Sequence, residues 1–100
     1  MEKRKAHHDL SAIKALVARD GLAVFTAVAR SGFMSMGLSA TEALSVVTAL
    51  SKAMLVKSMT THADHTVWQD VYHAPCRDGK VAYIKLTLRQ GAVVIQFKEK

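Results

Sequence analysis

The sequence predicts an α+β fold in which N-terminal helices pack on one face of a mainly antiparallel C-terminal sheet. The chain has 100 residues, and 50% of them are hydrophobic, which suits a single domain over residues 1–100 with one core. Up to about residue 52, apolar residues recur at helical spacing. Beyond it they alternate with polar residues, and β-branched and aromatic side chains collect in short runs, as in strands.

The first expected helix follows residue 9. Asp9 or Ser11 can cap its start, and Asp20-Gly21 can end it in a left-handed turn. Its apolar residues recur three to four positions apart, and they are Leu10, Ile13, Leu16 and Val17. This spacing predicts one amphipathic helix.

Two further helices are expected before residue 52. The second covers Val24 to Ser35, with its inward residues expected to be Phe25, Val28 and Phe33. The third begins at Ser39, because Ser39 and Glu42 have the spacing of a capping box. Its apolar face consists of Leu44, Val47 and Leu50.

Four strands are expected in the second half, over residues 55–61, 68–73, 81–89 and 92–98. Asp78-Gly79 and Gln90-Gly91 are typical hairpin turns, so the last three strands should form an antiparallel meander. The strand from Val81 to Arg89 places Ala82, Ile84, Leu86 and Leu88 on the core face and Tyr83, Lys85, Thr87 and Arg89 on the other. In the last strand, Val93, Ile95 and Phe97 should face the core, and Gln96 and Lys98 should face outward.

Composition excludes several classes of protein. The formal net charge is +6, and residues 51–100 carry eight basic and four acidic side chains, so we expect an anionic partner at the sheet half. No run of about 18 uncharged apolar residues is present, and the basic start is not followed by a signal-peptide core, so we expect a cytoplasmic protein without membrane contact. Cys76 is the single cysteine and cannot form an internal disulfide.

Metal and cofactor chemistry are not expected. His62, Asp64 and His65 are close in sequence, but in a strand His62 and His65 face opposite ways, so a hydrogen-bonded loop is the favoured interpretation. The five glycines form neither a phosphate-binding loop nor a dinucleotide-binding motif. We therefore expect no metal and no cofactor.

The uncovered face of the predicted sheet is the candidate site. It combines a phenol, a carboxamide and several cations, in Tyr83, Lys85, Thr87, Arg89, Gln96 and Lys98. Such groups bind phosphates, donate to base edges and stack on unpaired bases of RNA. An ordinary solvated surface is the alternative for Lys85 and Arg89.

Several segments carry a resemblance to a known family: Lys57-Ser-Met-Thr-Thr61, Asp64-His-Thr-Val-Trp-Gln-Asp-Val-Tyr72, Tyr83-Ile-Lys85 and Phe97-Lys98-Glu-Lys100. Together with the Met1-Glu-Lys-Arg start, this set resembles the motility quorum-sensing regulator (MqsR) toxins, the mRNA interferases of a bacterial toxin-antitoxin pair. The resemblance is close over 57–72 and at the end of the chain, and loose over 20–54.

The resemblance implies a RelE-like fold and a type II toxin. Its activity would be that of a metal-independent, ribosome-independent endoribonuclease that cuts single-stranded mRNA at short GC-containing sequences. The implied partners are mRNA and a cognate antitoxin that binds zinc and carries a helix-turn-helix domain, with DNA bound only through that antitoxin. The implied catalytic residues are Lys57, Gln69, Tyr83 and Lys98. Met59 would lie beside them. Substrate contacts are also expected from Lys85, Arg89 and Gln96 on the uncovered face, and from His62 and His73, which stand where the family pattern has other residues.

The chemistry of these groups suggests roles. If Lys57 and Lys98 converge, each lowers the pKa of the other, which favours Lys57 as a general base and leaves Lys98 to bind phosphate. Tyr83 would donate or orient a proton, and Gln69 would position substrate. Alternation puts Gln69 on the side of Val71, so a β-bulge near Trp68 would be needed to bring it to Tyr83. Trp68 and Tyr72 are expected to pack against the helices.

Two other functions remain possible at this stage. One is a non-catalytic RNA-binding module that uses the same basic face, and it would give salt-sensitive binding without cleavage. The other is a protein-interaction subunit in which the edge strand around Val93 to Phe97 pairs with a strand of its partner.

Overall fold

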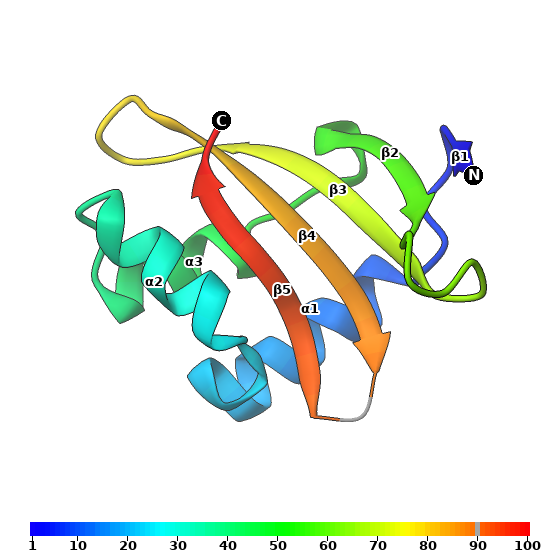
Figure 1. The fold of residues 1–100 in the computed structure, drawn as a ribbon. Helices are drawn as coiled ribbons and strands as arrows, with labels where there is room; N and C mark the ends of the chain where they lie inside the picture. Colours follow the sequence, from blue (N-terminus) through cyan, green and yellow to red (C-terminus); the bar gives the residue numbers. More distant parts are fainter. Residues whose placement is uncertain (90) are drawn as a thin grey trace.

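The computed structural model describes residues 1–89 and 91–100, and it confirms the α+β fold (Figure 1). In chain order the elements are β1 (Glu2–Lys3), α1 (Leu10–Asp20), α2 (Ala27–Ser35), α3 (Ala40–Thr48), β2 (Leu55–Thr60), β3 (Trp68–Pro75), β4 (Val81–Arg89) and β5 (Ala92–Glu99). Short 3-10 helices cover Gly21–Val24 and Lys52–Met54. No helix among the described residues is long and apolar enough to cross a membrane.

Within the described residues, five strands form one sheet in the order β1-β2-β3-β4-β5, and every neighbouring pair is antiparallel. The expected meander is therefore confirmed. Strand β1 was not predicted, because it consists of two charged residues and forms only where it can pair with β2. The turn expected at Gln90-Gly91 lies in part outside the described residues, because Gln90 is not described.

Local capping explains where two helices begin. The Asp9 carboxylate accepts hydrogen bonds from the backbone N–H groups of Ser11 (2.9 Å) and Ala12 (3.4 Å), so Asp9 is the cap of α1. The capping box of α3 is present, with Ser39 Oγ accepting from the Glu42 N–H and Glu42 Oε1 accepting from the Ser39 N–H. Gly21, at φ 59°, follows the last residue of α1.

The second helix differs from the prediction. It begins at Ala27 rather than Val24, because the chain first makes a 3-10 turn and Thr26 then caps α2 by accepting from the Ala29 N–H. With this start, Ala29 and Phe33 are the buried residues of α2. Val28 was expected to face the core, but it lies on the opposite side of the helix and is 63% exposed.

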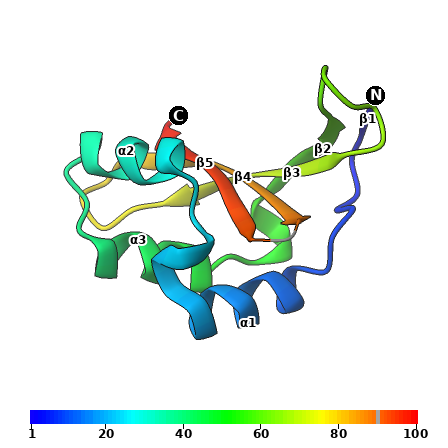
Figure 2. The same ribbon diagram turned by 60° about the horizontal axis from the view of Figure 1, so that its bottom comes forward.

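Helix α2 lies along the edge strand β5, whereas α1 and α3 lie together on one face of the sheet (Figure 2). The segment before α2 pairs with the edge of β5: the Thr26 N–H donates to the Val94 carbonyl (3.0 Å) and Thr26 Oγ1 donates to the Ile95 carbonyl (2.7 Å). Gly32 then meets the Phe97 carbonyl, with no room for a side chain. The edge of β5, at which a strand of a partner was expected to pair, is therefore covered by α2 and the segment before it.

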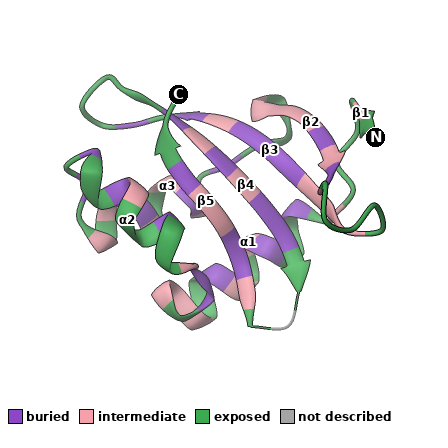
Figure 3. Ribbon diagram, viewed as in Figure 1, coloured by how far each residue is buried: buried purple, intermediate pink, exposed green. Residues whose placement is uncertain are grey.

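The face toward α1 and α3 holds the core, which includes the fully buried Tyr72, Ile84, Leu86 and Phe97 (Figure 3). The sequence placed Tyr72 correctly. Irregular pairing changes the alternation near the other end of β4 and β5: Lys85 pairs with Gln96, but Leu86 pairs with Val94, so β5 has an extra residue there. Val94 is consequently fully buried, and Ile95, expected in the core, is only partly buried.

A second irregularity, farther along the same pair of strands, exchanges two residues of β4. Thr87 was expected on the outer face but is 1% exposed, and its hydroxyl donates to the Trp68 carbonyl at 2.9 Å. Leu88 was expected in the core but is 39% exposed. A register shift between Leu86 and Arg89 explains both errors, since alternation holds only along regularly paired strands.

Candidate active site

Cross-strand pairing brings the candidate residues onto the uncovered face of the sheet. Residues directly opposite each other in an antiparallel sheet point to the same side. One row across the sheet consists of Lys57, Val71, Lys85 and Gln96. The next row consists of His73, Tyr83 and Lys98, and a third pairs Met59 with Gln69.

Tyr83 is the centre of a cluster of polar groups. The Lys98 ammonium lies 5.1 Å from the centroid of its ring, and the Lys85 ammonium lies 6.0 Å from it. The ring of His73 is 5.7 Å from that of Tyr83, centroid to centroid. A phenol, an imidazole and two ammonium groups from three strands therefore meet at one place, and we call these four residues the Tyr83 cluster.

Gln69 reaches this face without the bulge that the sequence analysis required. The pairing of β3 with β4 runs without a register shift from Asp70 to Pro75. Val71 itself lies on the uncovered face, where its neighbours bury it completely. Gln69 and Val71 therefore share the face of Tyr83 by plain alternation, and the expectation that a β-bulge near Trp68 would be needed was wrong.

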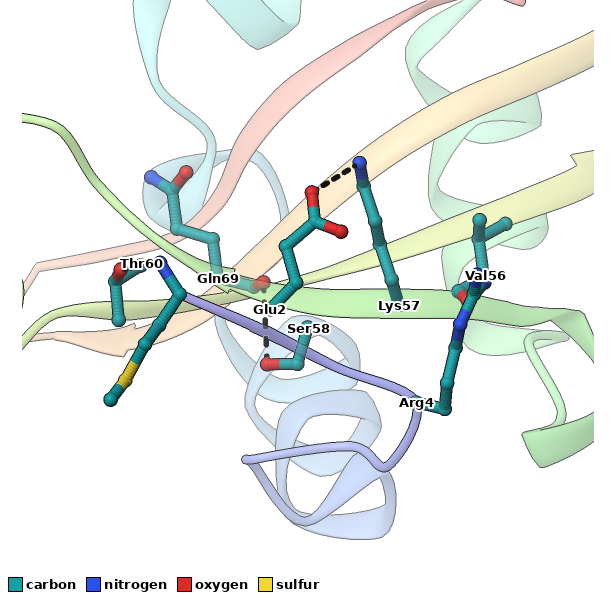
Figure 4. A network of polar contacts seen from close by, with 8 residues as sticks. Glu2, Arg4, Val56, Lys57, Ser58, Thr60 and Gln69 are labelled. Carbon is teal, nitrogen blue, oxygen red and sulfur yellow. Dashed lines mark hydrogen bonds and ion pairs between the residues drawn. The ribbon is translucent and has the colours of Figure 1, made fainter.

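The lysines of the middle row differ in their surroundings. Lys57 Nζ donates to the Glu2 carboxylate at 2.9 Å, which lowers the pKa of Glu2 (Figure 4). Burial lowers the pKa of Lys85, and the positive charges of Lys98 and Lys57 lower it further. None of the ion pairs among the described residues involves Lys85. Lys57 is thus matched by a carboxylate, and Lys85 is surrounded by like charge.

His73 is a neutral member of the cluster near pH 7. Partial burial lowers its pKa below the ordinary value of 6.5, and the Lys100 ammonium lowers it further. An imidazole without charge can accept or donate a hydrogen bond at either ring nitrogen.

Three expected substrate contacts lie away from the Tyr83 cluster. His62 is exposed in the loop between β2 and β3 and lines a separate hollow of about 320 Å³ beside Met59. Arg89 ends β4 six residues beyond Tyr83, roughly 20 Å along the strand. It lies near Asp64, whose pKa is lowered mainly by hydrogen bonds from Thr66 and further by the charge of Arg89. Met59 pairs with Gln69, at the edge of the candidate site.

Two acidic residues, Asp70 and Glu2, hold the N-terminal arm beside the candidate site, and neither was predicted to do so. Asp70 is fully buried and accepts hydrogen bonds from the backbone N–H groups of His7 (3.0 Å) and His8 (2.9 Å) and from the Ser58 hydroxyl. These bonds hold the N-terminal arm against the sheet. In this arm Glu2 pairs with Met59, and the Glu2 side chain reaches Lys57 (Figure 4). A carboxylate inside an apolar strand was the only signal for Asp70.

The N-terminal arm also covers the Trp68 ring. Its ring stacks on His7 at 5.0 Å between centroids, and the Lys3 ammonium lies 4.2 Å from its centroid. The expectation that Trp68 packs against the helices was therefore wrong, because residues 3–7 cover it instead.

The residues His62, Asp64 and His65 do not form a metal site. No group of three or more His, Cys, Asp or Glu side chains in the described parts of the chain could hold an ion.

Comparisons with known proteins identify the family to which the chain belongs. The family model described as "Motility quorum-sensing regulator, toxin of MqsA" matches residues 5–99. The chain belongs to this family. A curated MqsR-family relative from Escherichia coli (strain K12), named mRNA interferase toxin MqsR, is 40% identical over 100 residues, which covers 100% of both proteins. The family resemblance seen in the sequence is confirmed.

Proposed function

We propose that this protein is the toxin of a type II toxin-antitoxin pair, an endoribonuclease that cuts single-stranded mRNA in the cytoplasm and so inhibits translation and growth. Family membership and the 40% identical mRNA interferase support the class of reaction. The observation that carries the site is the Tyr83 cluster, in which two ammonium groups meet a phenol on the uncovered face of the sheet. We further propose that cleavage needs neither metal nor ribosome and favours short GC-containing sequences.

RNA contains its own nucleophile, the 2′-hydroxyl group. Cleavage requires removal of its proton, attack of the 2′-oxygen on the neighbouring phosphorus, and protonation of the departing 5′-oxygen. The products are a 2′,3′-cyclic phosphate and a 5′-hydroxyl. A base, an acid and groups that stabilise the phosphorane charge therefore suffice.

Lys85 meets the requirements of the base best. At the ordinary lysine pKa of about 10.4, only about one side chain in 2,500 would be neutral at pH 7. Burial and two neighbouring ammonium groups lower the pKa of Lys85, so a larger fraction can accept the 2′-proton. Lys57 was favoured for this role from the sequence, but it is paired with the Glu2 carboxylate, so we assign Lys57 to phosphate binding once RNA displaces Glu2.

The remaining residues take supporting roles in this proposal. Lys98 and Lys57 stabilise the phosphorane, and the Tyr83 hydroxyl protonates the 5′-oxygen. Gln69 positions the ribose and phosphate. Contacts to the rest of the RNA come from Met59, His62, His73, Arg89 and Gln96.

The protein partner we propose is the antitoxin that the family description names, MqsA. We expect it to bind zinc, to carry a helix-turn-helix domain and to inhibit the toxin, so that the toxin meets DNA only through the antitoxin. Whether the antitoxin covers the Tyr83 cluster is testable by competition with RNA.

The test is cleavage of an unstructured RNA by the purified chain in EDTA, with the ends of the products mapped. Wild type should cut, and Lys85→Ala, Lys98→Ala and Tyr83→Phe should each slow cutting by at least roughly 100-fold, within the range for loss of a general acid or base. Lys52→Ala is the matched control, because Lys52 is an exposed lysine outside the site. Loss of cleavage in EDTA would exclude the mechanism, and salt-sensitive binding without cleavage would favour the RNA-binding module.

A further inference from the structure

A groove runs beside the Tyr83 cluster between α2 and β5. Its first part is a hollow of about 310 Å³ lined by Thr26, Val28, Gln69, Lys85, Ile95 and Gln96. A second hollow of about 400 Å³ shares Val28 and Gln96 with the first and continues along α2 to Lys98. Both ends of this α2 groove therefore reach a lysine of the proposed active site.

The lining of the α2 groove combines an apolar wall with hydrogen-bonding groups. Val28 is one of the few large hydrophobic side chains that are strongly exposed, at 63%, and it lies at both hollows. Gln96 also lines both, and Gln69 lines the first. A carboxamide donates and accepts hydrogen bonds, which is what the edge of a nucleobase requires, and an apolar side chain packs on the flat face of a base.

The walls of the α2 groove are held in place by backbone contacts. Thr26 is bonded to β5 through its N–H and its hydroxyl, at 3.0 and 2.7 Å. One turn beyond Val28, Gly32 allows α2 to approach the Phe97 carbonyl closely. The distance between Val28 and the sheet is therefore fixed by the fold, so the groove exists before any ligand binds.

We propose that the α2 groove binds the base of a nucleotide next to the cleaved phosphate, with Val28 against the base and Gln96 hydrogen-bonded to its edge. This inference rests on the proposed function. RNA is the occupant that fits, because the groove is continuous with Lys98, whose charge matches a phosphate beside such a base, and with Lys85, the proposed base that acts on the neighbouring ribose. Val28 and Gln96 then help to determine which RNA sequences are cut. Val28 is also the residue that was expected in the core from the amino-acid sequence.

The experiment compares Gln96→Leu and Val28→Ser with wild type on a pool of single-stranded RNAs, and it measures the rate of cleavage at each sequence. Gln96→Leu should reduce the preference between the best and the average site by roughly tenfold or more, since a base contact of this kind discriminates by about that factor. Val28→Ser should weaken binding and flatten the preference in the same direction. Met34→Ser is the matched control, because Met34 is exposed to 64% on the same helix and lines neither hollow.

A second measurement separates failure of this inference from failure of the proposed function. Binding of the same RNAs, each with a 2′-O-methyl group at the cut position, is measured by fluorescence anisotropy. If wild type cuts and all variants keep its sequence preference, the groove assignment is wrong and the nuclease proposal stands. If wild type binds in a manner that depends on Val28 and Gln96 but cuts nothing, the nuclease proposal fails and the groove assignment stands.

Discussion

Replacement of Gly32 by alanine tests how α2 is held against the sheet. A Cβ built at Gly32 would lie 1.7 Å from the Phe97 carbonyl oxygen, whereas real Cβ contacts stay beyond 3.0 Å, so backbone must move by roughly 1.3 Å, the difference between the two. Helix propensity alone would stabilise the variant by about 1 kcal/mol. Overpacking of this kind costs about 1–3 kcal/mol or more, and here the obstacle is backbone rather than a flexible side chain.

We therefore expect Gly32→Ala to lower the free energy of unfolding by about 2 kcal/mol, which is an overpacking cost near the upper end of that range less the gain of about 1 kcal/mol in helix propensity. Urea denaturation followed by circular dichroism measures it, and the midpoint should fall by roughly 1 M at an ordinary slope. Ser31→Ala, on the exposed side of the same helix, is the control and should be neutral or slightly stabilising. A Gly32→Ala variant as stable as wild type would refute the close packing of α2 on β5, and with it the fixed width of the α2 groove.

Three further predictions concern the residues around the site. Asp70→Asn should lower the free energy of unfolding by about 2–3 kcal/mol, because the amide nitrogen that replaces one carboxylate oxygen cannot accept a hydrogen bond and leaves a buried donor unpaired; a change below about 0.5 kcal/mol in urea denaturation would contradict this. Because a base acts in its deprotonated form, kcat/KM should rise with pH and level off below the ordinary lysine pKa of 10.5; a profile unchanged by Lys85→Arg would exclude Lys85 as the base. Glu2→Gln should tighten RNA binding a few-fold at low salt, since it frees the Lys57 ammonium, and unchanged or weaker anisotropy-measured binding would argue against Lys57 as a phosphate contact.

Local sequence signals predicted those parts of the fold that depend on local contacts. The capping box of Ser39 and Glu42 is complete within four residues, and the period-two pattern of β4 identifies its faces as far as Leu86. The exchange of Thr87 and Leu88 could not be predicted, because it depends on a second register shift between β4 and β5, where β4 has the extra residue. Val28 was misassigned because the start of α2 is set by the bonds of Thr26 to β5, about 70 residues away in sequence.

The candidate site could likewise be predicted only in part, because some of its contacts join residues that are distant in sequence. The family resemblance supplied Lys57, Gln69, Tyr83 and Lys98, and the strand pattern placed Tyr83 and Lys98 on one face. The contact of Glu2 with Lys57 joins residues 55 positions apart, so it could not be predicted from a local sequence pattern. The different surroundings of Lys57 and Lys85 likewise arise only when β1 pairs with β2 and the N-terminal arm binds Asp70.

The most direct test of the central claim is cleavage of one RNA that carries a single 2′-deoxy nucleotide at its mapped cut site. Because the 2′-oxygen is the proposed nucleophile, cutting at that position should disappear in EDTA while cuts at other sites persist and end in 2′,3′-cyclic phosphates. Unchanged cutting at the deoxy position would contradict attack by the 2′-hydroxyl group, and with it the role of the Tyr83 cluster as a base, an acid and a phosphate clamp.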